Sequence, residues 1–431
     1  MGWWAEVYRC SRSELRPARI WAGLGAMSLL CATIVTAATK STRDGGLFET
    51  FLGIQALLLL LYGTHRVSVS VSAERSDRTW DFQRLTPLSS FDLAAGKLLG
   101  APLYAYFLAA SVLPWLFWGM LEPSMFGPMG TLPAFLCLLA VAYLTLSTGL
   151  MVSAFSETHD AGTVSAGGGM VGFAGIILFY SSVATMTVNQ SALQIPFYMM
   201  RVPVGLFLIP SYLAFGTWAF LAAKWRIGKD LLDPGRLWRL PAFLIFTAWY
   251  ALGWGGGEFS GTSKTLGSAA ALVVCVFLLF VSAIINREGA EHWKLWLTEA
   301  QGRADRTPVW LAGWATLVLI CALLGLIGPD RTLARMLIIV PAFLGRDLCF
   351  LQWCRLTESR QPEAMALVFL ALGYALPPIL VGVLASDLGW FHWVIPALSE
   401  KSSFVANVFP SLIHLGVMAA VLRARVGALV R

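Results

Sequence analysis

Runs of about 20 apolar residues recur along the whole chain, and they constrain its fold more than any other feature. An α-helix rises about 1.5 Å per residue, so a run of this length spans the hydrocarbon core of a bilayer. The sequence predicts twelve such helices, at residues 20–39, 47–64, 98–120, 131–155, 163–188, 202–223, 240–254, 265–285, 309–327, 332–351, 365–384 and 405–422. The seventh and ninth runs are short, and Pro341, Arg346 and Asp347 interrupt the tenth, so ten or eleven crossings are alternatives.

Composition supports this interpretation. The chain is 57% hydrophobic and 13% charged, whereas soluble chains are about a quarter charged. The basic residues behind the net charge of +7 are spread between the apolar runs, which argues against nucleic acid as a partner. We therefore expect an all-α, polytopic transmembrane bundle, with two six-helix halves as one possible arrangement.

The basic residues also indicate the orientation of the chain. If the N-terminus is cytoplasmic, most of the 31 Lys and Arg residues fall on cytoplasmic segments, as the positive-inside rule requires. The basic loops around residues 224–239 and 287–306 both lie on that side. The sequence predicts a multi-pass protein of a bacterial-type inner membrane with both termini in the cytoplasm.

Four segments are expected. Residues 1–19 form an amphipathic interfacial helix, because Trp3, Trp4, Val7 and Tyr8 share one helical side and Pro17 limits its length. Residues 20–223 form a six-helix half that contains a cytoplasmic loop at 65–97, residues 224–239 a basic linker, and residues 240–431 a second, divergent half. The odd count of seven Cys implies no disulfide framework. A small-residue face for close helix packing is expected at Gly167, Gly168, Gly169 and Gly172.

The loop at 65–97 is the most informative stretch. Pro87 disfavours helix at Thr86, and Ser89 with Asp92 three residues later forms a capping-box-like start for a helix that runs on into the third span. Two short helices are therefore expected in a rigid elbow. Charged residues surround an apolar knob, as docking to a protein groove requires. The knob comprises Trp80, Phe82, Leu85 and Leu88.

This loop resembles the signature of type-2 ABC exporter permeases: an acidic and basic start, Thr-aromatic-acidic, Thr-Pro-hydrophobic-Ser, then Gly-Lys. The matching residues are Glu74, Arg75, Thr79, Trp80, Asp81, Thr86, Pro87, Leu88, Ser89, Asp92, Gly96 and Lys97. Ser76 stands where the family usually has a second glutamate, and Arg78 where it usually has a glycine. The resemblance covers roughly residues 1–223, and Ser13-Glu14-Leu15-Arg16 is similar to the family's connecting helix.

The resemblance implies a permease subunit of an ATP-driven exporter. Such a subunit is not an enzyme, and the chain carries no phosphate-binding Gly-x4-Gly-Lys-Ser/Thr loop of its own. ATP and Mg would act in a separate cytoplasmic ATP-binding cassette subunit, and a second permease chain, the same or different, could complete the transporter. The residues implied at the ATPase interface are Glu74, Arg75, Thr79, Trp80, Asp81, Arg84, Thr86, Pro87, Leu88, Ser89, Gly96 and Lys97.

The resemblance fades after residue 223, although two short echoes leave a degenerate duplication open. Arg355-Leu356-Thr357 echoes Arg84-Leu85-Thr86, and Asn286-Arg287-Glu288-Gly289 echoes the charged start of the loop. Neither echo continues into Pro-Leu-Ser or Gly-Lys.

Two other classes of function remain alternatives. Twelve helices with a cytoplasmic N-terminus are also the architecture of ion-coupled secondary transporters built from two repeats, and a non-transporting scaffold or assembly subunit is the third. No metal spacing occurs among the five scattered histidines. Arg346 and Asp347 should point about 100° apart, each with its own partner, in a structural role. The weaker polar candidates are Gln55, His159, Asp160, Asn189, Asn407 and His414, and none of them defines a substrate site.

Overall fold

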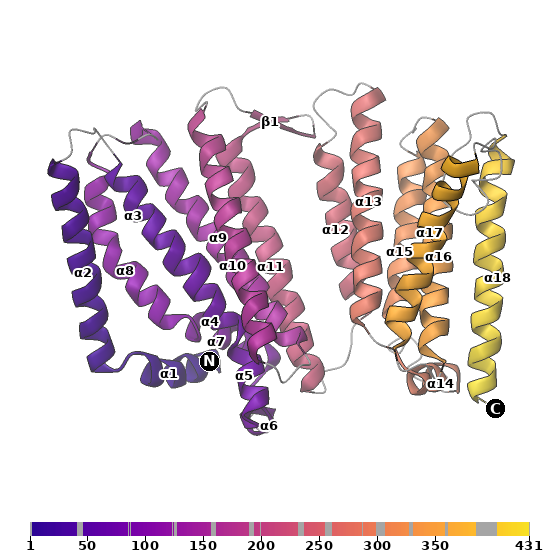
Figure 1. Cartoon of the computed structure of the whole chain (residues 1–431), viewed down its shortest axis with the longest axis horizontal. Helices are drawn as coiled ribbons and strands as arrows, with labels where there is room; N and C mark the ends of the chain where they lie inside the picture. The colour runs from indigo at the N-terminus through magenta and orange to yellow at the C-terminus, as the bar shows by residue number, and fades with distance from the viewer. Residues whose placement is uncertain are drawn as a thin grey trace. The chain divides into compact units, whose positions relative to one another are not determined.

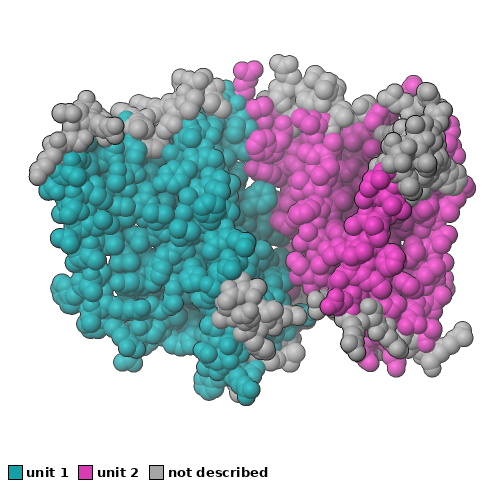
Figure 2. Space-filling model, viewed as in Figure 1, with its two compact units in different colours: residues 1–195, 202–234 teal, residues 196–201, 235–431 magenta. Residues whose placement is uncertain are grey.

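The computed structural model describes most of the chain. The described residues are 2–40, 46–84, 86, 88–122, 124, 127–156, 161–188, 194–198, 200–231, 237–254, 261–286, 288–298, 307–326, 331–357, 361–384 and 403–430. Within these ranges almost all regular structure is helical, and one two-stranded sheet joins β1 (Gln194–Phe197) to β2 (Met200–Pro203). Two compact units are distinguished in Figure 2: residues 1–195 with 202–234, and residues 196–201 with 235–431.

The first unit is a bundle of long helices with several short ones at one end (Figure 1). Its helices are α1 (Trp3–Glu14), α2 (Pro17–Lys40), α3 (Leu47–Ala56), η1 (Leu57–Gly63), α4 (Thr64–Ser68), α5 (Ser70–Ser76), α6 (Thr79–Arg84), α7 (Ser90–Gly100), α8 (Leu103–Gly119), α9 (Gly127–Phe155), α10 (Ala161–Val188) and α11 (Val204–Asp230). The segments α3, η1, α4 and α5 follow one another as a single apolar path. In this unit α1 lies across the end of the bundle from which α6 projects.

The second unit has its own buried apolar core. Its helices are α12 (Arg239–Trp254), α13 (Gly261–Ile285), α14 (Ala290–Thr298), α15 (Val309–Leu326), α16 (Arg331–Arg355), α17 (Pro362–Leu384) and α18 (Phe404–Val430). The central helix is α16, which packs against α13, α15, α17 and α18. The short α14 lies at one end of the unit (Figure 1).

Eight helices among the described residues are long and apolar enough to cross a membrane. They are Pro17–Ala38, Leu47–Ser76, Gly130–Phe155, Val164–Met186, Val204–Asp230, Leu266–Ile285, Val309–Leu326 and Phe404–Ala428. The bent pair of α7 and α8 would be a ninth. The remaining predicted crossings, α12, α16 and α17, are helical but are not among the eight, and the 16 residues of α12 cover about 24 Å, less than the hydrocarbon core.

The third predicted span is bent, which corrects the expectation of one continuous helix after Ser89. The first part, α7, ends at Gly100, α8 begins at Leu103, and the two axes differ by 46°. Pro102 lies at the break; it has no N–H to donate to the carbonyl of Leu98, and its ring crowds that carbonyl, while Ala101 itself keeps helical backbone angles. The bend therefore separates the helix carrying the candidate site from the apolar span that follows it.

Close helix packing on the glycine face of α10 is confirmed for two of the four predicted glycines. A Cβ at Gly172 would lie 2.5 Å from the carbonyl oxygen of Leu60, and a Cβ at Gly168 would overlap the side chain of Ser68. Gly169 faces open space, since a Cβ there meets nothing within 4 Å. The α10 backbone thus approaches η1 and α4 where only glycine fits.

Candidate functional site

The loop after the second span forms two short helices, as the sequence predicts, and α6 projects from the end of the first unit (Figure 1). Between α5 and α6, Arg78 adopts a φ of 57°. This left-handed conformation costs a residue with a side chain about 1 kcal/mol and favours glycine. The turn is therefore made here without the glycine that the type-2 permease signature usually places at this position.

The two faces of α6 have opposite exposure. Phe82 is 72% exposed, and Thr79 and Asp81 lie on the surface beside it. Trp80 is only 5% exposed, and the guanidinium of Arg75 lies 5.5 Å from the centre of its ring. The prediction that Trp80 belongs to an exposed knob is therefore wrong, because its ring packs inward and receives the cation on its face.

Of the other predicted knob residues, Leu88 is half-buried and packs against the core of the first unit. Leu85, Pro87 and the side chain of Arg84 lie outside the described part of the chain. Thr79, Asp81 and Phe82 form the exposed face of α6. This face carries one large apolar ring beside a carboxylate and a hydroxyl.

Behind α6, four charged side chains from three helices meet in a cluster formed by Glu6 and Arg9 of α1, Glu74 of α5 and Lys97 of α7. Lys97 Nζ lies 3.0 Å from Glu6 Oε1 and also pairs with Glu74. Arg9 pairs with Glu6 at 2.6 Å and with Glu74. Gln83 of α6 donates to Glu74 Oε1 at 2.9 Å. Glu74 therefore joins α1, α6 and α7 to α5.

Three of the four side chains in the cluster are largely removed from water, whereas Arg9 is 53% exposed. Glu6 is 4% exposed and the Lys97 side chain 2%. Burial raises the pKa of Glu6, but the charge of Lys97 and the hydrogen bonds from Arg9 and Lys97 outweigh it, so the pKa lies below its ordinary value. Burial likewise lowers the pKa of Arg9, but its bonds to Glu6 and Glu74 raise it overall. The cluster therefore sets two basic side chains against two acidic ones.

Gly96 creates the space for this cluster. The helix α1 crosses α7 at Gly96, where a Cβ would lie 2.5 Å from Glu6 Cβ and 3.2 Å from the carbonyl oxygen of Trp3. Real side chains do not approach so closely, so any larger residue would push α1 away from α7. The Gly96-Lys97 pair thus has two physical roles: Gly96 admits α1, and Lys97 binds its carboxylate.

The start of α1 is bound to the start of α7. The Trp3 N–H donates to Asp92 Oδ1 at 2.8 Å, and Ser89 Oγ–H donates to Asp92 Oδ2 at 2.6 Å. Ser89 Oγ in turn accepts the Asp92 N–H at 3.1 Å, so the predicted helix cap is confirmed. On α1, Trp4 and Tyr8 are exposed while Val7 is buried, which leaves two aromatic rings free for a membrane interface.

On the other side of α5, Arg75 joins the loop to the ends of two long helices. It pairs with Asp230 of α11 at 2.7 Å and donates to the carbonyl oxygens of Ala154, at 3.0 Å, and Ser156, at the end of α9. Arg226 holds the same Asp230 at 2.6 Å. A cation at helix C-termini satisfies carbonyls that lack partners inside the helix. Displacement of α5 would therefore move the ends of α9 and α11.

Two predicted threonines have local roles. Thr79 Oγ1 donates to the carbonyl oxygen of Glu74 at 3.3 Å, and Thr86 Oγ1 donates to that of Gln83 at 2.6 Å. These bonds close the turns before and after α6. Sequence reasoning missed Glu6 and Arg9 as site residues; the signal available was an acidic and a basic residue three positions apart on an otherwise aromatic helix.

Arg346 and Asp347 are paired with each other, which corrects the expectation of separate partners. Arg346 Nη2 lies 2.7 Å from Asp347 Oδ1 and 3.1 Å from the hydroxyl of Tyr374, which donates to Asp347. The long arginine side chain folds back along α16, and its guanidinium also lies 4.6 Å from the ring centre of Phe343. The pair is therefore satisfied within α16 and α17.

The weaker polar candidates bind neighbouring backbone or pack on rings. Gln55 donates to the carbonyl oxygen of Ala109 at 3.0 Å, and Asn407 to that of Ser403 at 3.2 Å. His414 packs against the ring of Phe343, with ring centres 5.9 Å apart. Asn189 and the pair His159-Asp160 lie outside the described residues. Among the residues that are described, no group of three His, Cys, Asp or Glu side chains is placed to hold a metal ion.

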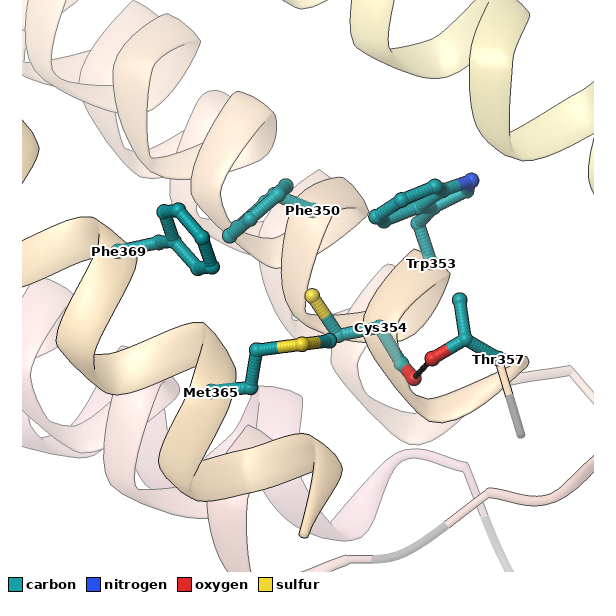
Figure 3. A pocket seen from close by; sticks show the side chains of 6 residues that line it. All are labelled: Phe350, Trp353, Cys354, Thr357, Met365 and Phe369. Carbon is teal, nitrogen blue, oxygen red and sulfur yellow. Dashed lines mark hydrogen bonds between the residues drawn. The ribbon is translucent and has the colours of Figure 1, made fainter. Parts of the chain in front are cut away.

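A cavity of about 580 Å³ lies between α16 and α17 of the second unit (Figure 3). Its lining residues are Phe350, Trp353, Cys354, Thr357, Met365 and Phe369. The one hydroxyl among them donates to the carbonyl oxygen of Cys354 (Figure 3). The cavity offers no charged side chain to a polar ligand and is not part of the loop site.

The long apolar helices of the two units define an integral, multi-pass membrane protein of the all-α class. Comparison with protein-family models, with characterised proteins and with solved structures finds no match to this chain.

Proposed function

We propose that this chain is the membrane-spanning permease subunit of an ATP-driven exporter of the type-2 ABC class. It couples through α5 and α6 to a separate cytoplasmic ATP-binding cassette subunit, which binds ATP and Mg. All twelve predicted helices cross an inner membrane, and both termini are cytoplasmic. The single observation that carries the proposal is the charge cluster that joins Glu74 to α1, α6 and α7.

The cluster supports a mechanical role. A force on the exposed face of α6 passes to α5 through the bond of Gln83 to Glu74, and from Glu74 to α1 and α7 through Arg9 and Lys97. It passes to α9 and α11 through Arg75. The buried pairs of Lys97 with Glu6 and Glu74 hold their geometry because breaking one pair leaves an uncompensated charge, whereas the half-exposed Arg9 adds a weaker, solvent-screened contact. The loop can therefore transmit a displacement rather than absorb it.

The exposed face of α6 suits a protein partner. An exposed aromatic ring beside a carboxylate is the kind of central residue and polar rim that a docking interface uses. Lys and Arg are abundant on the segments at this end of the first unit, including α1, as expected for the cytoplasmic side. A cytoplasmic ATP-binding subunit would meet α6 there.

The test is co-expression of the chain with ATP-binding cassette subunits of its own genome, followed by affinity purification and measurement of transport-coupled ATPase activity in proteoliposomes. Phe82→Asp should reduce the amount of ATP-binding subunit that co-purifies with the chain. The matched control is Leu121→Asp, an exposed leucine (85%) just after α8. Transport that persists with no ATP-binding subunit present would refute the proposal.

One observation favours a second candidate function, an ion-coupled secondary transporter. The trio of Arg346, Asp347 and Tyr374 lies inside helices α16 and α17, and ionisable groups within membrane helices often form ion pathways. This candidate predicts substrate transport that collapses with the proton or sodium gradient and survives ATP depletion. The exporter proposal predicts the reverse.

A further inference from the structure

We infer that the second unit is a diverged copy of the first and that α14 is a second docking helix for the same class of ATP-binding subunit. This inference rests on the proposed function, because it assigns a second binding site to the same partner. It is carried by the order of the helices, by their pairing and by the chemistry of α14. Each of these is a property of one unit considered by itself.

The order of elements is the same in the two units. Within the described residues, the long helices of the first unit are α2, the α3–η1–α4 path, α8, α9, α10 and α11, and those of the second are α12, α13, α15, α16, α17 and α18. In the first unit the second long helix continues into α5, and the short α6 interrupts the chain after it. In the second unit the short α14 does so at the same place.

Most of the pairing of the helices also agrees, although the packing of α10 on η1 and α4 in the first unit, and of α15 on α16 in the second, has at most a weak counterpart among the described residues of the other unit. In the first unit α9 packs along α10 and α11, α2 contacts α8, and the α3–η1–α4 path contacts α8 and α9. In the second unit α16 packs along α17 and α18, α12 contacts α15, and α13 contacts α15 and α16. In both, the fourth long helix meets the fifth and sixth, the first meets the third, and the second meets the third and fourth. Shared order and shared pairing together indicate duplication.

A buried arginine joins the second and fourth long helices in each unit. In the first, Arg75 reaches from the loop after the second helix to the carbonyl oxygens at the end of α9. In the second, Arg355 at the end of α16 donates to the carbonyl oxygens of Ala283 and Ile284, both at 2.8 Å, and of Asn286 at 3.1 Å, where α13 ends. In the first unit the arginine follows the second long helix and binds the end of the fourth, whereas in the second unit it ends the fourth long helix and binds the end of the second. Both arginines therefore join the same two helices of their unit.

In each unit an acidic residue near the short helices binds a residue close to where the third long helix begins: the last turn of α7 in the first unit and the first residue of α15 in the second. Glu74 pairs with Lys97 of α7, which leads into α8. Glu288 Oε1 accepts the backbone N–H of Val309, the first residue of α15, at 2.6 Å. Glu288 belongs to the segment that echoes the charged start of the first loop. In the second unit a backbone N–H takes the place of the lysine side chain as the partner of the acidic residue, so the two units have diverged at this bond.

The faces of α14 resemble those of α6. Trp293 is 5% exposed, with ring centres 5.7 Å from Trp296 and 6.3 Å from Trp310, so it packs inward as Trp80 does. The outward residues recur at three- and four-residue spacing along one helical face. They are Glu291, Lys294, Leu295 and Thr298, with Leu295 41% exposed.

The occupant of this face is a second copy of the ATP-binding subunit. In the proposed topology six crossings separate the first loop from α14, and an even number returns the chain to the same side of the membrane. Leu295 flanked by Glu291 and Lys294 offers an apolar side chain with a charged rim, as Phe82 does beside Asp81. One chain would then bind two motor subunits without a second permease chain.

The test is the stoichiometry of the purified, full-length complex by native mass spectrometry, and the expected ratio is two ATP-binding subunits per chain. Leu295→Asp should reduce the ratio from two to one, Phe82→Asp should also leave one, and the double variant none. The control is Leu121→Asp, an 85% exposed leucine just after α8 that lies outside the membrane-crossing helices. Thermal unfolding of each purified variant checks that it is folded.

The outcomes separate the two proposals. A ratio of one that Leu295→Asp leaves unchanged and Phe82→Asp abolishes would overturn the second docking helix and keep the proposed function. A ratio of zero for the unaltered chain would overturn both. A photo-crosslinker introduced at Lys294 adds a second measurement, with an adduct to the ATP-binding subunit expected and adducts to lipid alone contrary to the inference.

Discussion

Lys97 Nζ of α7 lies 3.0 Å from Glu6 Oε1 of α1, although 91 positions separate the two residues and both are buried. This ion pair fixes the N-terminal helix on the loop that follows the second span. Because Glu74 and Arg9 complete the cluster, α1, α5 and α7 behave as one body. The predictions below test that rigidity and its link to the proposed motor subunit.

Replacing Lys97 by methionine should destabilise the first unit. The substitution leaves Glu6 buried with only Arg9 as a cation and breaks the link to Glu74. Removing one partner of a buried ion pair costs about 3–5 kcal/mol. Thermal unfolding in detergent, followed by intrinsic fluorescence, should show a clear decrease in Tm.

The control for that experiment is Arg12→Met, because Arg12 lies on the exposed side of α1. It should change Tm little. Combining Lys97→Met with Glu6→Gln should recover part of the loss, since the buried carboxylate is then neutral. If the double variant is less stable than Lys97→Met by as much as Glu6→Gln alone destabilises the protein, the two effects are additive. That result would show that the two residues do not interact.

Replacing Gly96 by alanine should detach α1 without changing any charge. The added methyl group would lie 2.5 Å from Glu6 Cβ, which is too close for both helices to keep their positions. Hydrogen–deuterium exchange of residues 3–14 should accelerate, while that of α9 stays slow. Gly169→Ala is the matched control, because a Cβ there meets nothing within 4 Å and alanine favours helix by about 1 kcal/mol. Equal exchange in the two variants would contradict the proposed packing.

Acidification should release α1. The pKa of Glu6 is lower in the folded protein than its ordinary value of 4.5, so the folded state binds the proton more weakly than the unfolded state does. This contribution to stability is fully present above about pH 4.5 and is lost as the pH falls through the lower folded pKa. Exchange of residues 3–14, corrected for the intrinsic rate at each pH, should rise in that window. The Glu6→Gln variant should lack the transition, and an identical transition in both proteins would assign it to another group.

Replacing Arg78 by glycine should stabilise the loop. Arg78 holds a φ of 57°, which glycine adopts without strain. The relief is partly offset by the greater freedom of glycine in the unfolded chain, so a net gain of about 0.5–1 kcal/mol is expected. Asp77→Gly is the control. The φ of −79° at Asp77 is unstrained for any residue, so glycine there only increases the conformational entropy of the unfolded chain and should lower stability. A decrease in Tm for Arg78→Gly would contradict the left-handed turn.

Much of the helical framework could be predicted because it depends on local pattern. Within the described residues each of the twelve apolar runs lies mainly in helix, apart from the break at Pro102 in the third run and Val202 and Pro203 of the sixth, which belong to β2. Ser89 caps α7 as its spacing with Asp92 indicates. Length and composition set those features. Among the described residues, eight or nine helices are long and apolar enough to cross a membrane, and the higher count remains part of the proposal.

The details of the site could not be predicted, because they depend on contacts between residues distant in sequence. The inward turn of Trp80 follows from its packing beneath Arg75, and the bond between Arg346 and Asp347 from a rotamer that helical periodicity does not fix. Glu6 and Arg9 belong to the site because α1 packs against α7 in the folded chain, a contact that the sequence pattern does not reveal. Periodicity identifies a face of a helix but not the partner that covers it.

The most direct test of the central claim is photo-crosslinking from the exposed face of α6 in intact membranes. A Phe82→p-benzoylphenylalanine variant should form an adduct with an ATP-binding cassette subunit, and a cysteine at Asp81 should be shielded from membrane-impermeant reagents added outside the cell. Absence of the adduct, together with labelling of Asp81→Cys from the exterior, would contradict the account.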